Sequence, residues 1–284
     1  MKTTRNIAWL LPLGLALASL PMAFAQLPAL DKQPWLGYFA AYEGRHFKVG
    51  ITGHGEIKLT PLNDKGDEFG PHMALAVPIG IEEIQPDGKA DMKVIRMESL
   101  KSEQPPTDKL ERVVLQGQVS AEAVFEAAIE QKGGVVSIGG RVLDKGQFKK
   151  NPIRFAVRVK VPNSHPWTKE ESWKSDPKKV AAFLKKIEGD SIELNRIDKK
   201  RITWTFEKPV DAASSELTGP GASRLEIRMQ AFGDRRFLFD ASENSVMTIS
   251  NTPNTPLYEG FTISWVPDAE KDKDGKARLG FIVK

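Results

Sequence analysis

The fold is decided by the stretch Ile153-Arg154-Phe155-Ala156-Val157-Arg158-Val159-Lys160-Val161. Its odd-numbered positions are all apolar, whereas Arg154, Arg158 and Lys160 occupy even-numbered ones. Successive side chains of a strand point to opposite faces of the sheet, so this period of two predicts a strand with one buried and one solvated face. A strand with one face of each kind is typical of an antiparallel sheet.

The same alternation recurs on both sides of this stretch. Segments rich in Gly, Pro, Asn and Asp, such as 63–70 and 251–256, separate the alternating runs and predict turns between them. Repeated short strands with few helix signals indicate an all-β protein, specifically an antiparallel β-sandwich, either a large sandwich or a supersandwich-like one. The further alternating runs span 47–51, 57–59, 73–81, 113–119, 202–206, 225–229, 261–265 and 279–283.

Segment 47–59 predicts one hairpin in detail. A three-residue turn at Gly53-His54-Gly55 pairs Val49 with Leu59 and places the apolar residues of both strands on one face. A two-residue turn would set apolar residues against polar ones and lose the buried face. We therefore expect the longer turn.

Segment 121–131 is compatible with a helix or a strand, because its three glutamates lie four residues apart. That spacing is close to one helical turn and is also two strand repeats. A strand is favoured because it can form a hairpin with 135–142 through a tight turn at Lys132-Gly133. The expected pairs are Ile129 with Val136, Ala127 with Ile138 and Phe125 with Gly140.

One short helical insertion is predicted, near residues 176–188. Asp176 can cap its N-terminus, Pro177 suits its first position and Gly189 can end it. An apolar stripe at i, i+3, i+4, i+7 spacing predicts that one side packs on the sandwich while lysines face solvent. The stripe consists of Val180, Phe183, Leu184 and Ile187.

The first 25 residues have the pattern of a secretory signal peptide. Lys2 and Arg5 precede a short apolar run at 7–20, and Ala23-Phe24-Ala25 offers the small residues that a signal peptidase requires. The apolar run is shorter than the ~20 residues of a spanning helix. We therefore expect a secreted or periplasmic bacterial protein, with no membrane span in the mature chain 26–284.

The composition is that of an ordinary globular protein, with 40% hydrophobic and 27% charged residues. Residues 26–284 are enough for one β-sandwich domain that carries the helix, and this is the organisation we expect. The formal charge of +4 is small for 284 residues and predicts no nucleic-acid partner. The chain has no cysteine, which excludes disulfides, thiolate metal sites and cysteine nucleophiles.

No residue pattern for catalysis or metal binding stands out. His46 and His54 fall at opposite ends of one predicted strand, too far apart to share a metal. His165 follows Ser164, but neighbours on an extended chain point to opposite sides, so a nucleophilic triad is not expected. The acidic loop 268–275 resembles the start of a calcium loop, yet its lysines favour a charged hairpin tip. We therefore predict no metal and no cofactor.

The strongest functional lead is a polar loop that contains Trp167 and Trp173 and follows His165. A tryptophan on a strand with alternating apolar residues is readily explained as part of the buried core. A tryptophan surrounded by charged residues in a loop is less readily explained in that way. An exposed flat ring with polar neighbours can stack on the face of a sugar. These three residues are therefore candidate carbohydrate-binding groups. The alternative is that the rings fold back and cap the open end of the sandwich.

A basic face is the second lead. Arg154, Arg158 and Lys160 share one side of the predicted strand and could bind an anionic ligand. Arg141 is expected on a nearby strand, and Lys149 and Lys150 come just before this one. The alternative, which we favour, is that they pair with carboxylates across the sheet. The expected partners are Glu122, Glu126 and Glu130.

Three candidate functions follow from these observations, and the first two belong to different classes. The first is a non-catalytic secreted protein that binds carbohydrate, with a glycan as its partner. The second is a carbohydrate-active hydrolase or lyase on a β-sandwich, and a structural component of the bacterial envelope with a protein partner is a third alternative. The lack of a recognisable acid–base pattern favours binding over catalysis, although a fold does not fix a function.

Overall fold

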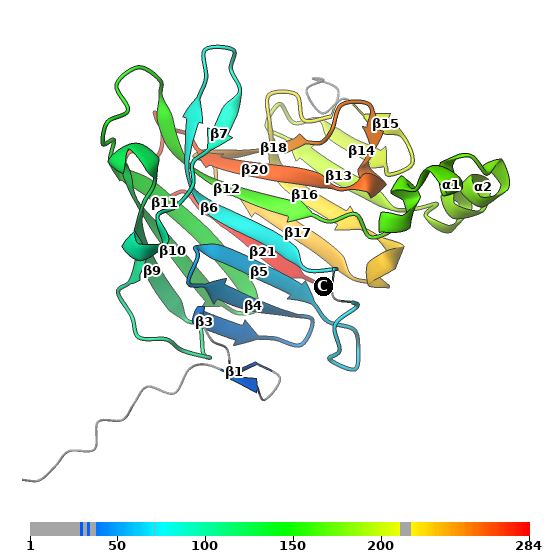
Figure 1. Ribbon diagram of the computed structural model, residues 1–284, viewed down its shortest axis with the longest axis horizontal. Coiled ribbons are helices and arrows are strands. Elements are labelled where there is room, and N and C mark those ends of the chain that lie inside the picture. Colours follow the sequence, from blue (N-terminus) through cyan, green and yellow to red (C-terminus); the bar gives the residue numbers. More distant parts are fainter. Residues whose placement is uncertain (1–28, 31–32, 35–37, 71, 211–216) are drawn as a thin grey trace, which may run out of the picture.

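The computed structural model describes residues 29–30, 33–34, 38–70, 72–210 and 217–284. It is almost entirely antiparallel β structure, in which one large sheet folds round until it is nearly closed (Figure 1). The predicted all-β, sandwich-like class is therefore confirmed. The predicted signal peptide, residues 1–25, lies outside the described residues.

Two layers of strands make up this sheet, and within each layer neighbouring strands pair antiparallel. The first layer runs β3 (Tyr38–Glu43), β4 (Phe47–Thr52), β5 (Glu56–Pro61), β6 (Leu75–Ile84), β12 (Ile153–Val161), β20 (Phe261–Pro267) and β18 (Ser245–Ser250). The second runs β8 (Lys101–Ser102), β9 (Arg112–Gln118), β10 (Val124–Lys132), β11 (Val135–Asp144), β21 (Leu279–Val283), β17 (Arg236–Ala241), β16 (Ala222–Arg228), β13 (Ser191–Arg196) and β14 (Arg201–Thr205).

The two layers meet along both long sides of the molecule. On one side, Ala222 of β16 pairs with Met247 of β18. On the other side, Ala40 of β3 forms a parallel bridge with Thr107, and the amide of Ala41 donates to the carbonyl of Thr107 at 2.8 Å. These contacts leave few unpaired strand edges, which are the usual sites of unwanted association.

Smaller elements connect the strands. β7 (Ala90–Met92) extends the end of β6 as a hairpin, and Figure 1 shows it standing out from the body of the sandwich. Two further short pairs are β1 (Ala29–Leu30) with β2 (Gln33–Pro34) and β15 (Pro209–Val210) with β19 (Thr255–Pro256). The helical elements are α1 (Glu171–Lys174), α2 (Pro177–Lys186) and the 3-10 turns η1 (Met97–Ser99), η2 (Ser120–Glu122), η3 (Pro166–Lys169), η4 (Gln230–Phe232) and η5 (Leu257–Glu259).

The stretch that decides the fold is β12, in the middle of the first layer between β6 and β20. Phe155, Val157 and Val159 are buried in the core, as their alternation predicts. The ring of Phe155 reaches across the sandwich to Phe125 of β10, with 6.1 Å between ring centroids. Aromatic rings that face each other from the two layers therefore fill the centre of the core.

The hairpin predicted from segment 47–59 is confirmed. Val49 pairs with Leu59, and the chain turns through Gly53-His54-Gly55 as expected. Gly55 has φ +77°, a backbone conformation that glycine adopts without strain. The apolar pattern thus set the register of these two strands.

The second predicted hairpin forms, but its register is wrong by two residues. Its turn is Gly133-Gly134 rather than Lys132-Gly133, because both turn residues need positive φ (+59° and +80°) and two glycines supply it. Because side chains alternate between the two faces of a strand, a register error of two residues leaves the same side chains facing inward. The observed pairs are Ile129 with Ile138, Ala127 with Gly140 and Phe125 with Val142.

Within the described residues, no helix is both long and apolar enough to cross a membrane.

Gly140 provides a direct test of the core packing. A β-carbon there would overlap the ring of Phe155 and come within 2.5 Å of the Glu126 carbonyl oxygen. We expect Gly140→Ala to lower the free energy of unfolding by about 2 kcal/mol or more, because an overpacked core cannot relax freely. Urea denaturation would measure the change.

Gly280 on β21 is the matched control, because a β-carbon there would meet nothing closer than 3.6 Å. Gly280→Ala should leave the unfolding midpoint nearly unchanged. Equal effects of the two substitutions would contradict this account of the core.

Candidate functional site

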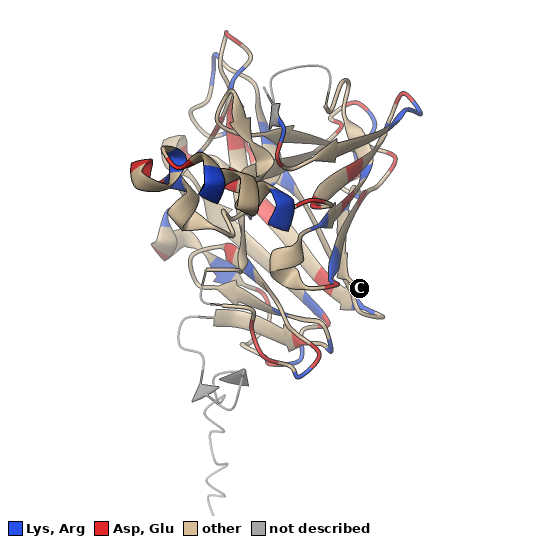
Figure 2. Ribbon diagram, turned by 90° about the vertical axis from the view of Figure 1, so that its right-hand side faces the viewer, with Lys and Arg blue, Asp and Glu red and all other residues tan. Residues whose placement is uncertain are grey.

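A helical excursion leaves the sandwich after β12 and returns at β13. It consists of η3, α1 and α2, and it stands out at one end of the molecule (Figure 1). In Figure 2 this excursion faces the viewer and carries both basic and acidic residues along its length. The sequence predicted α2 but treated η3 and α1 as a long loop.

Local sequence fixes the start of α2. The carboxylate of Asp176 accepts hydrogen bonds from the amides of Lys178 (3.0 Å) and Lys179 (3.2 Å), and Pro177 occupies the first turn. These contacts satisfy amide groups that a helix N-terminus leaves without partners. Phe183 and Ile187 on the predicted apolar stripe are buried. The predicted cap and apolar stripe of this helix are therefore confirmed.

Phe183 of α2 is the centre of an aromatic cluster. Four rings surround it edge to face, with centroids 5.0 to 5.3 Å away and interplanar angles of 70° to 86°. Edge-to-face packing at these distances is favourable, because the positive edge of one ring meets the negative face of the next. The four surrounding rings belong to His165, Trp167, Trp173 and Tyr258.

The cluster opens to solvent as a shallow depression of about 450 Å³, which we call the aromatic depression. Trp167 is 40% exposed, whereas Trp173 is only 8% exposed. Apolar surface combined with ammonium donors suits a ligand that has both apolar faces and hydroxyl groups. The depression is lined by Trp167, Trp173, Phe183, Ala182, Lys179 and Lys186.

The structure brings the two predicted tryptophans together, with ring centroids 5.3 Å apart. His165, the third predicted residue, packs beneath them against Phe183 and is only 8% exposed. Burial lowers the pKa of His165, and the nearby charge of Lys186 lowers it further, so the ring is neutral at pH 7. His165 thus supports Trp167 from within the cluster.

The expected geometry of Ser164 and His165 is wrong. The Ser164 hydroxyl lies 2.8 Å from Nδ1 of His165, although adjacent residues of an extended chain point apart. His165 is not extended (φ −135°, ψ 66°), because it is the N-cap residue just before η3, and this brings the two side chains to one side. Among the described residues, no carboxylate is recorded in contact with this pair, so the triad geometry is incomplete.

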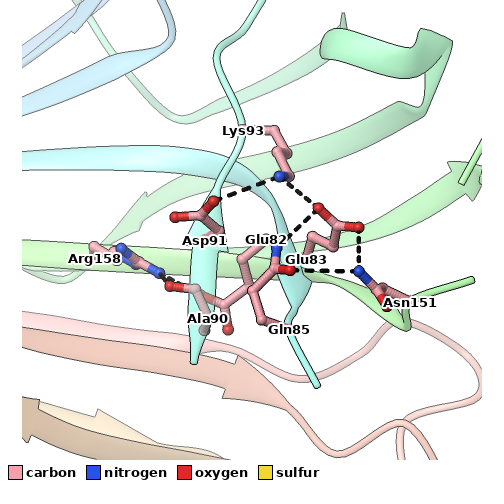
Figure 3. A network of polar contacts seen from close by, with 8 residues as sticks. All are labelled: Glu82, Glu83, Gln85, Ala90, Asp91, Lys93, Asn151 and Arg158. Atoms are coloured by element: carbon pink, nitrogen blue, oxygen red, sulfur yellow. Dashed lines mark hydrogen bonds and ion pairs between the residues drawn. The ribbon is translucent and has the colours of Figure 1, made fainter. Parts of the chain in front are cut away.

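Two residues of the predicted basic face, Arg154 and Arg158, are held in an ion cluster. Glu82 of β6 is 1% exposed and accepts from Arg154 at 2.7 Å and from Arg158 at 2.9 Å. Arg158 also donates to the carbonyl of Ala90 at 2.8 Å (Figure 3). Pairing across the sheet was expected, but the predicted partners were wrong because β12 lies beside β6 and not beside β10.

Of the glutamates named as partners, Glu126 pairs with a member of the predicted basic face, Arg141, as expected, and the other two are engaged elsewhere. Glu126 pairs with Arg141 at 3.2 Å, and Glu130 pairs with Arg112 at 3.0 Å. Glu122 accepts from the side-chain amide of Gln147 at 3.1 Å.

A second polar group lies beside the Glu82 cluster (Figure 3). Glu83 contacts Lys93 at 2.6 Å and accepts from Asn151 at 2.7 Å and Gln85 at 3.1 Å. The hydrogen bond from Lys93 lowers the pKa of Glu83, and the reciprocal contact raises the pKa of Lys93. These contacts tie the β6–β7 hairpin to the loop before β12, so this network stabilises the fold.

The carboxylates of the acidic loop 268–275 accept hydrogen bonds from the loop itself and from neighbouring residues. Asp272 accepts from the side chain of Asn244 at 2.6 Å and from the amide of Lys276 at 2.7 Å, and Asp268 accepts from the amide of Glu270 at 3.0 Å. The part of the chain that the structure describes contains no group of three or more His, Asp or Glu side chains arranged to hold a metal.

Sequence reasoning did not identify the lysines of the aromatic depression. Lys179, Phe183 and Lys186 are spaced i, i+4, i+7 and therefore share one face of α2. This spacing was available in the sequence. Tyr258 was not accessible to such reasoning, because it comes from η5, far away along the chain.

The sequence matches no protein-family model and no curated protein. Its fold resembles part of a solved structure of an α-N-acetylgalactosaminidase, NagBb from Bifidobacterium bifidum, in complex with GalNAc. The TM-score is 0.52 at 10% identity, and the match covers 86% of this chain and 35% of that chain. Structures of the same enzyme with Gal-NHAc-DNJ and as a quadruple mutant give TM-scores of 0.48. The chain thus spans about a third of that enzyme's length, and the likeness concerns the fold alone.

Asp190, between α2 and β13, is a buried carboxyl group at the base of the excursion. It is 2% exposed and accepts a hydrogen bond from the amide of Gln230 at 2.8 Å. Burial raises its pKa to about 6, and the charge of Glu207 contributes in the same direction. The ionised form is therefore disfavoured in the folded protein.

This pKa predicts a pH dependence of stability. Because the folded pKa lies above the ordinary value of 3.8, the group favours folding below pH ~4, and this contribution is lost as the pH rises through about 6. Asp190→Asn keeps an acceptor but cannot ionise. Relative to the native protein, we expect it to be about 2 to 3 kcal/mol more stable at pH 8 and nearly equal at pH 4. Urea denaturation at both pH values would test this, and a difference that did not change with pH would contradict it.

Proposed function

We propose that this protein is a non-catalytic carbohydrate-binding protein that acts in the periplasm or outside the cell, with a glycan bound at the aromatic depression. The observation that carries the proposal is the exposed ring of Trp167 beside Lys179 and Lys186. The C–H face of a sugar ring packs on an aromatic surface, and ammonium groups donate hydrogen bonds to its hydroxyls.

The packing around Trp167 supports this role. Its ring makes edge contacts with His165, Trp173 and Phe183 at 5.9, 5.3 and 5.2 Å, so three neighbours hold it in place. A ring that is already fixed loses little conformational freedom when a ligand stacks on it. The depression is therefore organised before binding.

The fold similarity agrees with a carbohydrate-related role. The matched structure belongs to an enzyme that was solved with a sugar bound, and the match covers 86% of this chain. Because only 35% of that enzyme is covered and the identity is 10%, the likeness supports the class of ligand more than any particular activity.

Export is part of the proposal, and it rests on the pattern of residues 1–25. We expect the protein recovered from the periplasm or culture medium to begin at Gln26. Intact-mass measurement would show this, and recovery of the uncleaved chain only from the cytoplasm would exclude export.

Substitution of Trp167 tests the binding site. We expect Trp167→Ala to weaken binding to the preferred glycan by about tenfold or more, because the largest exposed stacking surface is lost. Trp167→Phe keeps a flat ring and should retain most of the affinity. A glycan array screened with the purified protein would identify the ligand, and calorimetry would then give the affinities.

Trp204→Ala is the control, because this partly buried tryptophan of β14 is not part of the depression. Circular dichroism would verify that each variant folds. If Trp167→Ala and Trp204→Ala bound the glycan equally well, the depression would not be the site. If the native protein bound no glycan at all, the proposal would be wrong and a protein partner would become the leading alternative.

A carbohydrate-active enzyme is the second candidate, and one observation favours it. Asp190 lines a hollow of about 290 Å³, and its pKa of about 6 lies in the range of a general acid. A second carboxyl group, Glu207, is near enough to affect that pKa. This alternative predicts sugar release from the bound glycan and loss of that release in Asp190→Asn, whereas binding without release supports the first proposal.

A further inference from the structure

A second hollow, of about 550 Å³, lies at the end of β12, and we call it the polar hollow. Its lining comes from the end of β12 and the chain that follows it, η3, the end of β18 with the loop after it, η5 and the start of β20. The charged side chains of the lining are two lysines, Lys160 and Lys169, and one glutamate, Glu259. The lining therefore has a net positive charge, which favours an anionic group.

The two lysines are not neutralised by the described residues. Lys160 is exposed, and its partners on the neighbouring strands are the uncharged Thr262 and Ala76. Neither Lys160 nor Lys169 forms a recorded ion pair within the described part of the chain, whereas Arg154 and Arg158 share Glu82. Of the three basic residues on β12, Lys160 alone keeps its charge available for a ligand.

Asn163 adds a hydrogen-bond donor to this lining. Its Oδ1 accepts from the backbone amide of His165 at 2.7 Å, which fixes the orientation of the side-chain amide. Its Nδ2 is buried and donates to no group among the described residues. A shielded donor without an acceptor is unfavourable, so a small side-chain movement that exposed this amide to an acceptor atom of a ligand would be stabilising.

The polar hollow and the aromatic depression meet at η3, and η5 contacts both. η3 carries Trp167 of the depression and Lys169 of the hollow. η5 carries Tyr258, whose ring lies 5.1 Å from Phe183, and Glu259 of the hollow. Trp167 and Lys169 thus place the two sites next to each other on η3, while Tyr258 supports the depression through Phe183, so we expect a short oligosaccharide to span both sites.

We propose that the glycan bound at the aromatic depression is acidic, and that its carboxylate or sulfate group binds in the polar hollow to Lys160, Lys169 and the Nδ2 of Asn163. This inference rests on the proposed carbohydrate-binding function and names the class of glycan. Ammonium and amide donors that converge on an anion form charge-assisted hydrogen bonds, which are stronger than those to sugar hydroxyls. The negative charge of Glu259 would repel a ligand that placed several anionic groups in the hollow. The lining therefore suits a ligand with a single anionic group there.

The test is a glycan array that carries neutral, uronate-containing and sulfated oligosaccharides, probed with the full protein and its variants. We expect the native protein to retain acidic members, and the comparison of uronates with sulfates identifies which anion it prefers. Lys160→Ala/Lys169→Ala should weaken that binding by about tenfold or more at low salt. Asn163→Asp keeps the acceptor for His165 but replaces the donor by a carboxylate, and it should weaken acidic ligands selectively.

The matched control is Lys178→Ala/Lys185→Ala, which removes the same charge from lysines of α2 that line neither site. If both double variants lost the same amount of affinity for acidic glycans, the loss would be due to the change in net charge alone. That result would overturn the inference. If the native protein bound only neutral glycans, and Trp167→Ala abolished that binding, the inference of an acidic ligand would be wrong. The proposed carbohydrate-binding function would still stand. Retention of no glycan by the native protein would reject both.

Discussion

The structure depends on the ring of Phe155, which packs across the sandwich. It lies 6.1 Å from Phe125 of the opposite layer and 6.4 Å from Trp265 of its own, and it covers Gly140, where no side chain would fit. This packing fixes the phase of β12. A slip of one residue would place Arg154 and Arg158 in the core, at a cost that no local rearrangement offsets.

The position of β12 determines where both candidate sites lie. The chain leaves the sandwich at Val161, builds η3, α1 and α2, and returns at Ser191. The aromatic depression therefore follows the end of β12 along the chain, and Lys160 lies at that same end. Arg154 lies opposite Glu82 of β6 and Arg158 reaches the same carboxylate, whereas Lys160 lies opposite Ala76 of β6, which carries no charge. One strand thus supplies a structural ion cluster and a cation available to a ligand.

The fold class and the local elements could be predicted from the sequence, because alternation and capping act between neighbouring residues. Val49 and Asp176 behave as predicted for this reason. Some strands were not predicted because a polar residue occupies a buried position, or an apolar residue occupies an outward one, so the alternation is not evident in the sequence. In β18, the buried positions begin with Ser245 while Val246 points the other way. The site required contacts between distant residues, such as Phe183 with Tyr258 and Arg158 with Glu82, which no spacing encodes.

The two interpretations of the tryptophan loop, a cap for the sandwich or a ligand platform, describe different residues of one cluster. Trp173 and Phe183 are buried and perform the capping role, since they cover the end of the core. Trp167 rests on them with its ring edge-on to three neighbours and is still 40% exposed. A ring needed only for the cap would gain stability from further burial. The same packing that closes the end of the sandwich therefore holds one indole ring open to solvent, which is the arrangement a sugar-binding surface requires.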